Sequence, residues 1–114
     1  MKALAHSLFI LSILIGAIQG SGLWAAGGGA SKGKQLYEEH CMVCHGRGGK
    51  GDGYRLFNPP PADLTSPAVQ EKLDAALLKT IHEGRPNTAM GTWKYVLSSE
   101  EARDVLAYVR SLSR

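Results

Sequence analysis

The feature that most constrains this chain is the pentapeptide Cys41–Met42–Val43–Cys44–His45, which contains both of its cysteines. Two intervening residues set the cysteine sulfurs apart by the separation of the two vinyl groups of haem, and the histidine that follows can turn under the iron. Both cysteines are then consumed as thioethers, so neither remains for a disulfide. The motif predicts one covalent haem c, attached through Cys41 and Cys44, with His45 as an axial iron ligand.

The surroundings of the cysteine pair disfavour two other interpretations. A thioredoxin-like redox pair opens a helix after a strand, whereas this pair comes at the end of a predicted helix and is followed by glycines. A structural zinc site needs four ligands, and the remaining histidines of the exported part, His40 and His82, are not paired at a short spacing.

The N-terminal segment has the pattern of a secretory signal peptide. Lys2 precedes an apolar run over residues 8–18, and small residues follow this run. The run is too short for a comfortable membrane span of roughly 20 residues. We expect a signal peptide over residues 1–26, cleaved between 22 and 30, and a periplasmic domain over residues 27–114. The alternative is a leader retained as an inner-membrane anchor, which would be the one membrane contact.

The exported part is long enough for one small domain. A domain of this size needs a disulfide, a metal or a cofactor to stabilise its fold in addition to the packing of its side chains. We expect four helical segments: one from an N-cap at Ser31 to about Cys41, a short one starting at Ser66–Pro67, one over residues 73–83 that Gly84 ends, and one after a capping box of Ser98 and Glu101. No alternating strand pattern appears, so the fold class is predicted to be all-α.

The other segments are predicted loops. Residues 46–53 contain five glycines, residues 58–61 form an extended proline run, and residues 85–96 are irregular. The glycine-rich segment lacks the Gly-Lys-Ser/Thr ending of a phosphate-binding loop. The formal charge is only +3, without a basic run or an interleaved aromatic stripe, so we expect no nucleic-acid partner.

A second axial ligand is expected because haem iron in electron carriers is commonly six-coordinate. Met42 sits between the attachment cysteines and cannot reach the opposite face, and His40 meets the same objection. Met90 lies in a loop after the helix over residues 73–83 and is predicted to be the sixth ligand. His82 is its main rival.

From about residue 31 to residue 112 the chain resembles the class I cytochromes c, in the small single-haem bacterial group. The motifs that carry the resemblance occur in the order of that family: Gly33-x-x-x-Tyr37, Cys41-x-x-Cys44-His45-Gly46, the glycine-rich loop, the stretch from Pro60 to Thr65, Ile81-x-x-Gly84, Met90 with Trp93, and Val105-x-x-Tyr108. The resemblance implies a cytochrome c-like fold of three to five helices wrapped around one haem.

The resemblance also implies specific contacts. Gly33 and Tyr37 should pack against the last helix near Tyr108. A carbonyl of the proline run at 59–61, with Pro60 as our choice, should accept the Nδ1 proton of His45.

Further residues are expected around the haem. Trp93, together with Tyr54 or Arg55, should lie near the propionates. The sequence departs from the family at Met90–Gly91, where the family often has Met-Pro, and a glycine there loosens the backbone.

These features predict a one-electron carrier and not an enzyme, passing electrons between respiratory or dehydrogenase partners outside the cytoplasm. His/Met ligation raises the reduction potential relative to His/His ligation. The competing class is a haem peroxidase or gas sensor with an open distal site. A subunit fixed to a larger respiratory complex is a further alternative.

Overall fold

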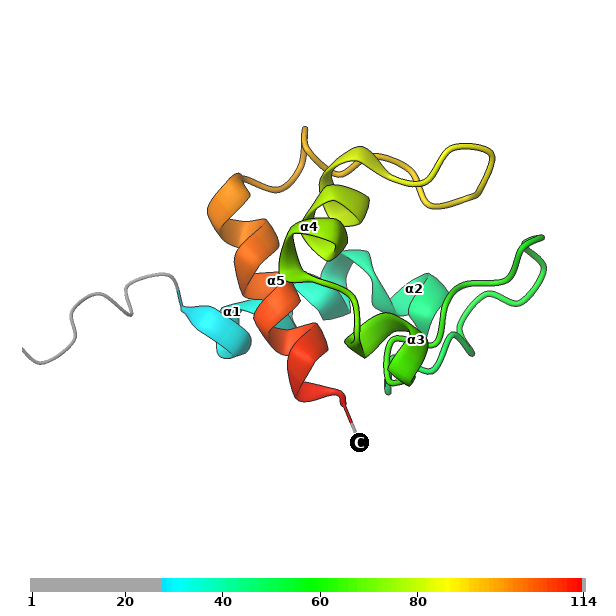
Figure 1. Cartoon of the computed structure of the whole chain (residues 1–114), viewed down its shortest axis with the longest axis horizontal. Helices are drawn as coiled ribbons and strands as arrows, with labels where there is room; N and C mark the ends of the chain where they lie inside the picture. Colours follow the sequence, from blue (N-terminus) through cyan, green and yellow to red (C-terminus); the bar gives the residue numbers. More distant parts are fainter. Residues whose placement is uncertain (1–27, 114) are drawn as a thin grey trace, which may run out of the picture.

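The computed structural model describes residues 28–113, so the predicted leader lies outside the described residues. This part of the chain forms five helices and no strand: α1 (Gly29–His40), α2 (Met42–His45), α3 (Pro67–Gln70), α4 (Asp74–Glu83) and α5 (Ser99–Ser111). The all-α prediction is confirmed, within the expected range of helices. Figure 1 shows α1 and α5 crossing at one end of the molecule, with two long loops extending from the other.

The crossing of α1 and α5 depends on Gly33. A Cβ atom built there would lie 1.8 Å from the carbonyl oxygen of Asp104, so only a glycine allows the two backbones to come this close. One turn further along α1, Tyr37 is fully buried. Its ring centroid lies 5.1 Å from that of Tyr108, with the rings tilted by 58°. The predicted packing of Gly33 and Tyr37 on the last helix is confirmed.

The apolar core has two clusters that share α5. Val105 and Val109 of α5 pack with Leu36, Tyr37 and Leu97, whereas Leu106 packs with Val69 and Leu77. The helical repeat of about 3.6 residues turns neighbouring residues of α5 to different sides, which explains how one helix serves both clusters. Helix α5 is thus the element on which the rest of the domain is assembled.

The helix ends follow the local signals, with one exception. The capping box is confirmed, because the Glu101 N–H donates to Ser98 Oγ (3.1 Å) and the Ser98 N–H donates to Glu101 Oε2 (3.0 Å). Gly84 follows α4 with a positive φ of 75°. The predicted N-cap at Ser31 is wrong. Helix α1 begins at Gly29, and the left-handed Gly28 precedes it as a cap without a side-chain hydrogen bond.

Hydrogen bonds hold the segments that connect the helices against the helices themselves. The glycine-rich segment folds back on α2, since the Gly51 N–H donates to the His45 carbonyl at 2.8 Å. Arg110 of α5 fixes the link between α3 and α4 by donating to the carbonyls of Gln70 (2.7 Å) and Lys72 (2.6 Å). The segments between α2 and α3 and between α4 and α5 lie on the same side of the molecule (Figure 1) and form the walls of a cavity.

Candidate functional site

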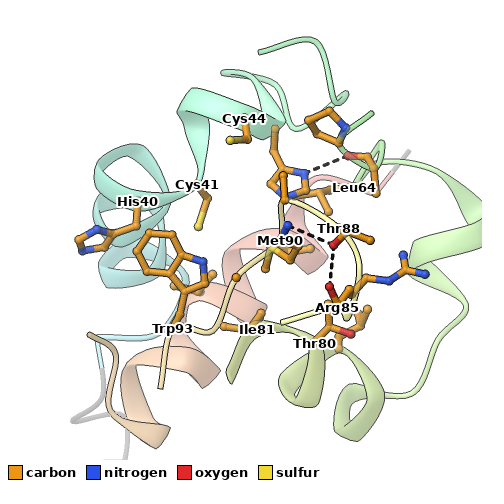
Figure 2. A pocket seen from close by; sticks show the side chains of 18 of the residues that line it. His40, Cys41, Cys44, Leu64, Thr80, Ile81, Arg85, Thr88, Met90 and Trp93 are labelled. Atoms are coloured by element: carbon orange, nitrogen blue, oxygen red, sulfur yellow. Dashed lines mark hydrogen bonds between the residues drawn. The ribbon is translucent and has the colours of Figure 1, made fainter. Parts of the chain in front are cut away.

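A cavity of about 530 Å³ lies between α2, α4, α5 and the two loops. Its size is within the range of cofactor pockets, roughly 300–1,000 Å³. Cys41, Cys44 and His45 line it from one segment, and Met90 and Trp93 line it from the loop after α4. Figure 2 shows Cys41 and Met90 directed into this space.

The cysteine motif forms a single helical turn. The carbonyl of Cys41 accepts hydrogen bonds from the N–H groups of Cys44 (3.2 Å) and His45 (2.9 Å). This turn brings both cysteines and His45 to the cavity, while the intervening Val43 is exposed. Met42 packs on the core cluster and is not among the residues that line the cavity.

The environment of the Cys41 thiol does not suit the reactive cysteine of a dithiol redox centre. Burial raises the pKa of the Cys41 thiol to about 11, and the neighbouring Cys44 adds to this rise. Reactive cysteines have the opposite property, a lowered pKa. Within residues 28–113, no group of three or more His, Cys, Asp and Glu side chains is arranged to hold a metal ion.

His45 is oriented by a backbone carbonyl. Its Nδ1 lies 3.0 Å from the carbonyl oxygen of Ala62. A carbonyl can only accept, so Nδ1 donates and Nε2 is left with a free lone pair for a metal. The prediction that a proline carbonyl accepts this hydrogen bond was wrong. The proline run lies along the cavity wall, and the His45 ring bonds instead to the carbonyl of Ala62, the residue that follows the run. Pro60 lines the cavity together with Pro59 and Pro61.

Met90 is brought to the cavity by a sharp reversal of the chain after α4. A Cβ atom added to Gly84 would lie 2.5 Å from the carbonyl oxygen of Met90, and the positive φ of Gly84 also favours glycine there. The N–H of Arg85 donates to the same Met90 carbonyl at 2.9 Å. The chain reversal at the end of α4 therefore helps to place Met90 at the cavity.

The two rival histidines lie in different places. His82 is not among the cavity-lining residues, and its Nε2 lies 3.4 Å from the carbonyl oxygen of Ser98. His40 does line the cavity, with its ring centroid 5.4 Å from that of Trp93. It lies on the same segment as Cys41, the segment that supplies His45.

Comparison with known proteins assigns the chain to a family. Residues 30–113 match the family model described as cytochrome c, which covers nearly all of the described part of the chain. The chain belongs to the cytochrome c family. It is a class I c-type cytochrome of the small bacterial group, it binds one haem c covalently, and its chemistry is haem-based electron transfer.

Three proteins illustrate the range of similar cytochromes. FixP, a cbb3-type cytochrome c oxidase subunit of Bradyrhizobium diazoefficiens, is 32% identical over 89 residues, which cover 73% of this chain and 27% of FixP. Cytochrome c-554(547) of Halothiobacillus neapolitanus is 35% identical over 92 residues, covering 75% of this chain and 98% of that protein. The crystal structure of cytochrome cL from Hyphomicrobium denitrificans has a TM-score of 0.61 at 26% identity, covering 77% of this chain and 49% of that one.

The lengths of these relatives differ. This cytochrome spans about a quarter of FixP and nearly all of cytochrome c-554(547). None of the helices within residues 28–113 is long and apolar enough to span a membrane.

The charges around the cavity fit a haem. Its lining contains no carboxylate and two cations, Lys72 and Arg85. The flat, apolar ring of haem carries two propionates, which such cations can neutralise. Trp93 lines the cavity as expected, but Tyr54 and Arg55 are not among the lining residues, and the ring of Tyr54 lies against Phe57 at a centroid distance of 4.6 Å.

Arg85 and Lys72 were not singled out from the sequence as cations of the cavity, and the expected position of Tyr54 or Arg55 near the propionates stays a prediction. Arg85 follows Gly84 at the start of the loop that carries Met90, and that position is the signal that could have found it. No pattern in the sequence marks Lys72 as a cavity residue. It lies at the cavity because the link between α3 and α4 packs on α5.

Proposed function

We propose that this cytochrome is a one-electron carrier in which Cys41 and Cys44 hold the haem as thioethers and His45 and Met90 are the axial iron ligands. The observation that carries the proposal is that these four side chains line one cavity although they come from segments far apart in the sequence. Met90 is the one methionine of the described residues among its lining.

The chain supplies orientation and a dry environment, and the haem supplies the Fe(II)/Fe(III) couple. The Ala62 carbonyl fixes the ring of His45 and raises its basicity. Met90 offers a soft thioether, which favours the ferrous state and a high potential. Apolar side chains shield the space between them, among them Leu64, Val69, Leu77, Ile81, Val105 and Leu106.

The carrier is proposed to act in the periplasm, after removal of a signal peptide over residues 1–26. Its partners are proposed to be redox proteins. The coverage of cytochrome c-554(547), almost end to end, supports a small free cytochrome. FixP is named as a subunit of a cytochrome c oxidase, and this similarity supports the alternative of a subunit held in a larger complex.

The competing function is a haem peroxidase or gas sensor, which needs an open distal position. The placement of Met90 in the cavity supports the carrier. Carbon monoxide discriminates between the two, because a six-coordinate ferrous protein binds it poorly at neutral pH. Rapid binding to the native ferrous protein would favour the competing function.

An optical spectrum of the ferric holoprotein tests the ligand set. We expect the weak near-infrared sulfur-to-iron charge-transfer band in the wild type and its loss in Met90→Ala. Met42→Leu is the matched control, because Met42 packs on the core outside the cavity lining, and it should keep the band. A band that is absent in the wild type, or that survives in Met90→Ala, contradicts His/Met ligation and makes His82 the next residue to test.

A further inference from the structure

The hydroxyl of Thr88 closes the loop that carries Met90. Thr88 Oγ1 donates to the carbonyl oxygen of Arg85 at 2.8 Å and accepts from the N–H of Met90 at 3.1 Å. Figure 2 shows both hydrogen bonds beside the cavity. One hydroxyl thus uses its donor and one of its acceptor positions to join the two ends of a six-residue loop.

Both backbone polar groups of Met90 are connected to Arg85, the carbonyl directly and the N–H through the side chain of Thr88. Its carbonyl accepts directly from the N–H of Arg85 at 2.9 Å. Its N–H reaches the carbonyl of Arg85 through Thr88 Oγ1. Without the hydroxyl, one of these two connections is lost, and the backbone at Met90 is held from one side only.

The chain beyond Met90 is anchored to the end of α4. The His82 carbonyl at the end of α4 accepts from the N–H groups of Trp93 (3.1 Å) and Lys94 (3.2 Å), and also from Thr92 Oγ1. Gly91 separates this anchor from Met90, and a Cβ atom added to it would meet nothing within 4 Å. A glycine has a wider range of backbone conformations than other residues, so the anchor at His82 does not by itself fix Met90.

We propose that Thr88 is a positioning residue, whose hydroxyl keeps the loop closed with Met90 held toward the iron. This inference rests on the proposed ligation by Met90. The two hydrogen bonds of the Thr88 hydroxyl join residues that are brought together in the closed loop, and water satisfies the same groups when the loop opens. Loss of the hydroxyl therefore shifts the equilibrium toward the open loop, in which an external ligand can take the sixth position.

Imidazole titration of the ferric holoprotein measures this equilibrium, because imidazole binds only when Met90 has left. We expect Thr88→Val, which keeps the shape but lacks the hydroxyl, to bind imidazole roughly tenfold more tightly than the wild type, the size expected for a lost hydrogen bond. Thr88→Ser should restore near wild-type affinity. Thr65→Val is the matched control, since the Thr65 hydroxyl also makes a local hydrogen bond, to Asp63 Oδ1, but Thr65 is not among the residues that line the cavity.

The outcomes separate this inference from the proposed function. If the wild type shows the near-infrared band but Thr88→Val binds imidazole within twofold of it, the role of Thr88 is overturned and Met90 ligation stands. If the wild type lacks the band and binds imidazole as tightly as Met90→Ala, Met90 ligation fails, and the role of Thr88 fails with it.

A measurement on the wild type covers the case in which Thr88→Val does not fold. In the ferrous protein, the N–H of Met90 should exchange with solvent more slowly than that of Ala89, for which the described residues provide no acceptor. Equal exchange of the two amides would overturn the proposed role of Thr88.

Discussion

Gly33 of α1 lies directly against the backbone of Asp104 in α5. A Cβ atom at Gly33 would be 1.8 Å from the Asp104 carbonyl oxygen and 3.0 Å from the Val105 nitrogen. These are backbone atoms of a helix, which cannot rotate away as the end of a flexible side chain can. The helix pair that supports the cavity therefore needs a glycine at this position.

Gly33→Ala should force α1 and α5 apart and destabilise the holoprotein by about 3 kcal/mol, as overpacking of a rigid contact does. Denaturant unfolding followed by circular dichroism measures the change. Gly48→Ala is the matched control, because Gly48 has a permissive φ and nothing within 4 Å of an added Cβ. An equal, small effect of both substitutions would contradict the close approach.

Replacement of both Cys41 and Cys44 by Ala should release the haem. The wild type should keep its haem through extraction with acidified organic solvent, since thioether bonds survive it, and the double variant should lose it. Absorbance of the protein fraction after extraction gives the answer. Haem that can be extracted from the wild type would contradict covalent attachment through these cysteines.

Local signals predicted α1, α3, α4 and α5 because the causes of these helices are local, whereas the short α2 was not predicted. Ser98 and Glu101 are three residues apart and cap α5 through their own backbone. Pro67 fits the first turn of α3, and Gly84 supplies the positive φ that ends α4. The start of α1 was missed because Gly28, which has no side chain to signal a cap, precedes the helix in place of Ser31.

The cavity was harder to predict because its contacts join distant segments. The acceptor of His45 Nδ1 depends on how the proline run crosses the histidine ring, and this crossing decides between Ala62 and Pro60. Arg55 and Arg85 both lie in loops, and only the packing of those loops shows that Arg85 lines the cavity. The motif identified the chemistry, whereas the supporting contacts required the fold.

Tyr37→Phe should destabilise the protein by about 1–2 kcal/mol near neutral pH. The buried Tyr37 hydroxyl donates to the carbonyl of Gly46 at 2.6 Å, and its removal leaves that carbonyl without this donor. Urea unfolding of the holoprotein measures the difference. The exposed Tyr95 provides the matched control, and Tyr95→Phe should have little effect.

The destabilisation by Tyr37→Phe should also shrink as the pH rises above about 10. Burial, mainly, raises the pKa of Tyr37 above its usual value near 10. The folded state then keeps a proton that the unfolded state loses, so the wild type loses stability from this residue as the pH rises through that value. Phenylalanine has no such proton. A stability gap that widens at alkaline pH would contradict the buried, protonated tyrosine.

Arg85→Gln should lower the reduction potential by about 20–40 mV, because a screened unit charge near the surface contributes less than about 1 kcal/mol. Arg85 and Lys72 are the cations of a cavity lining that has no carboxylate. Removing one of them leaves the propionates less neutralised, and the extra negative charge favours ferric over ferrous iron. Redox titration with small mediators at low salt measures the shift, and added salt should reduce it.

The matched control is Arg103→Gln, which removes the same charge from an exposed residue of α5 outside the cavity lining. Equal shifts in the two variants would show that net charge alone is responsible and that Arg85 does not interact with the haem.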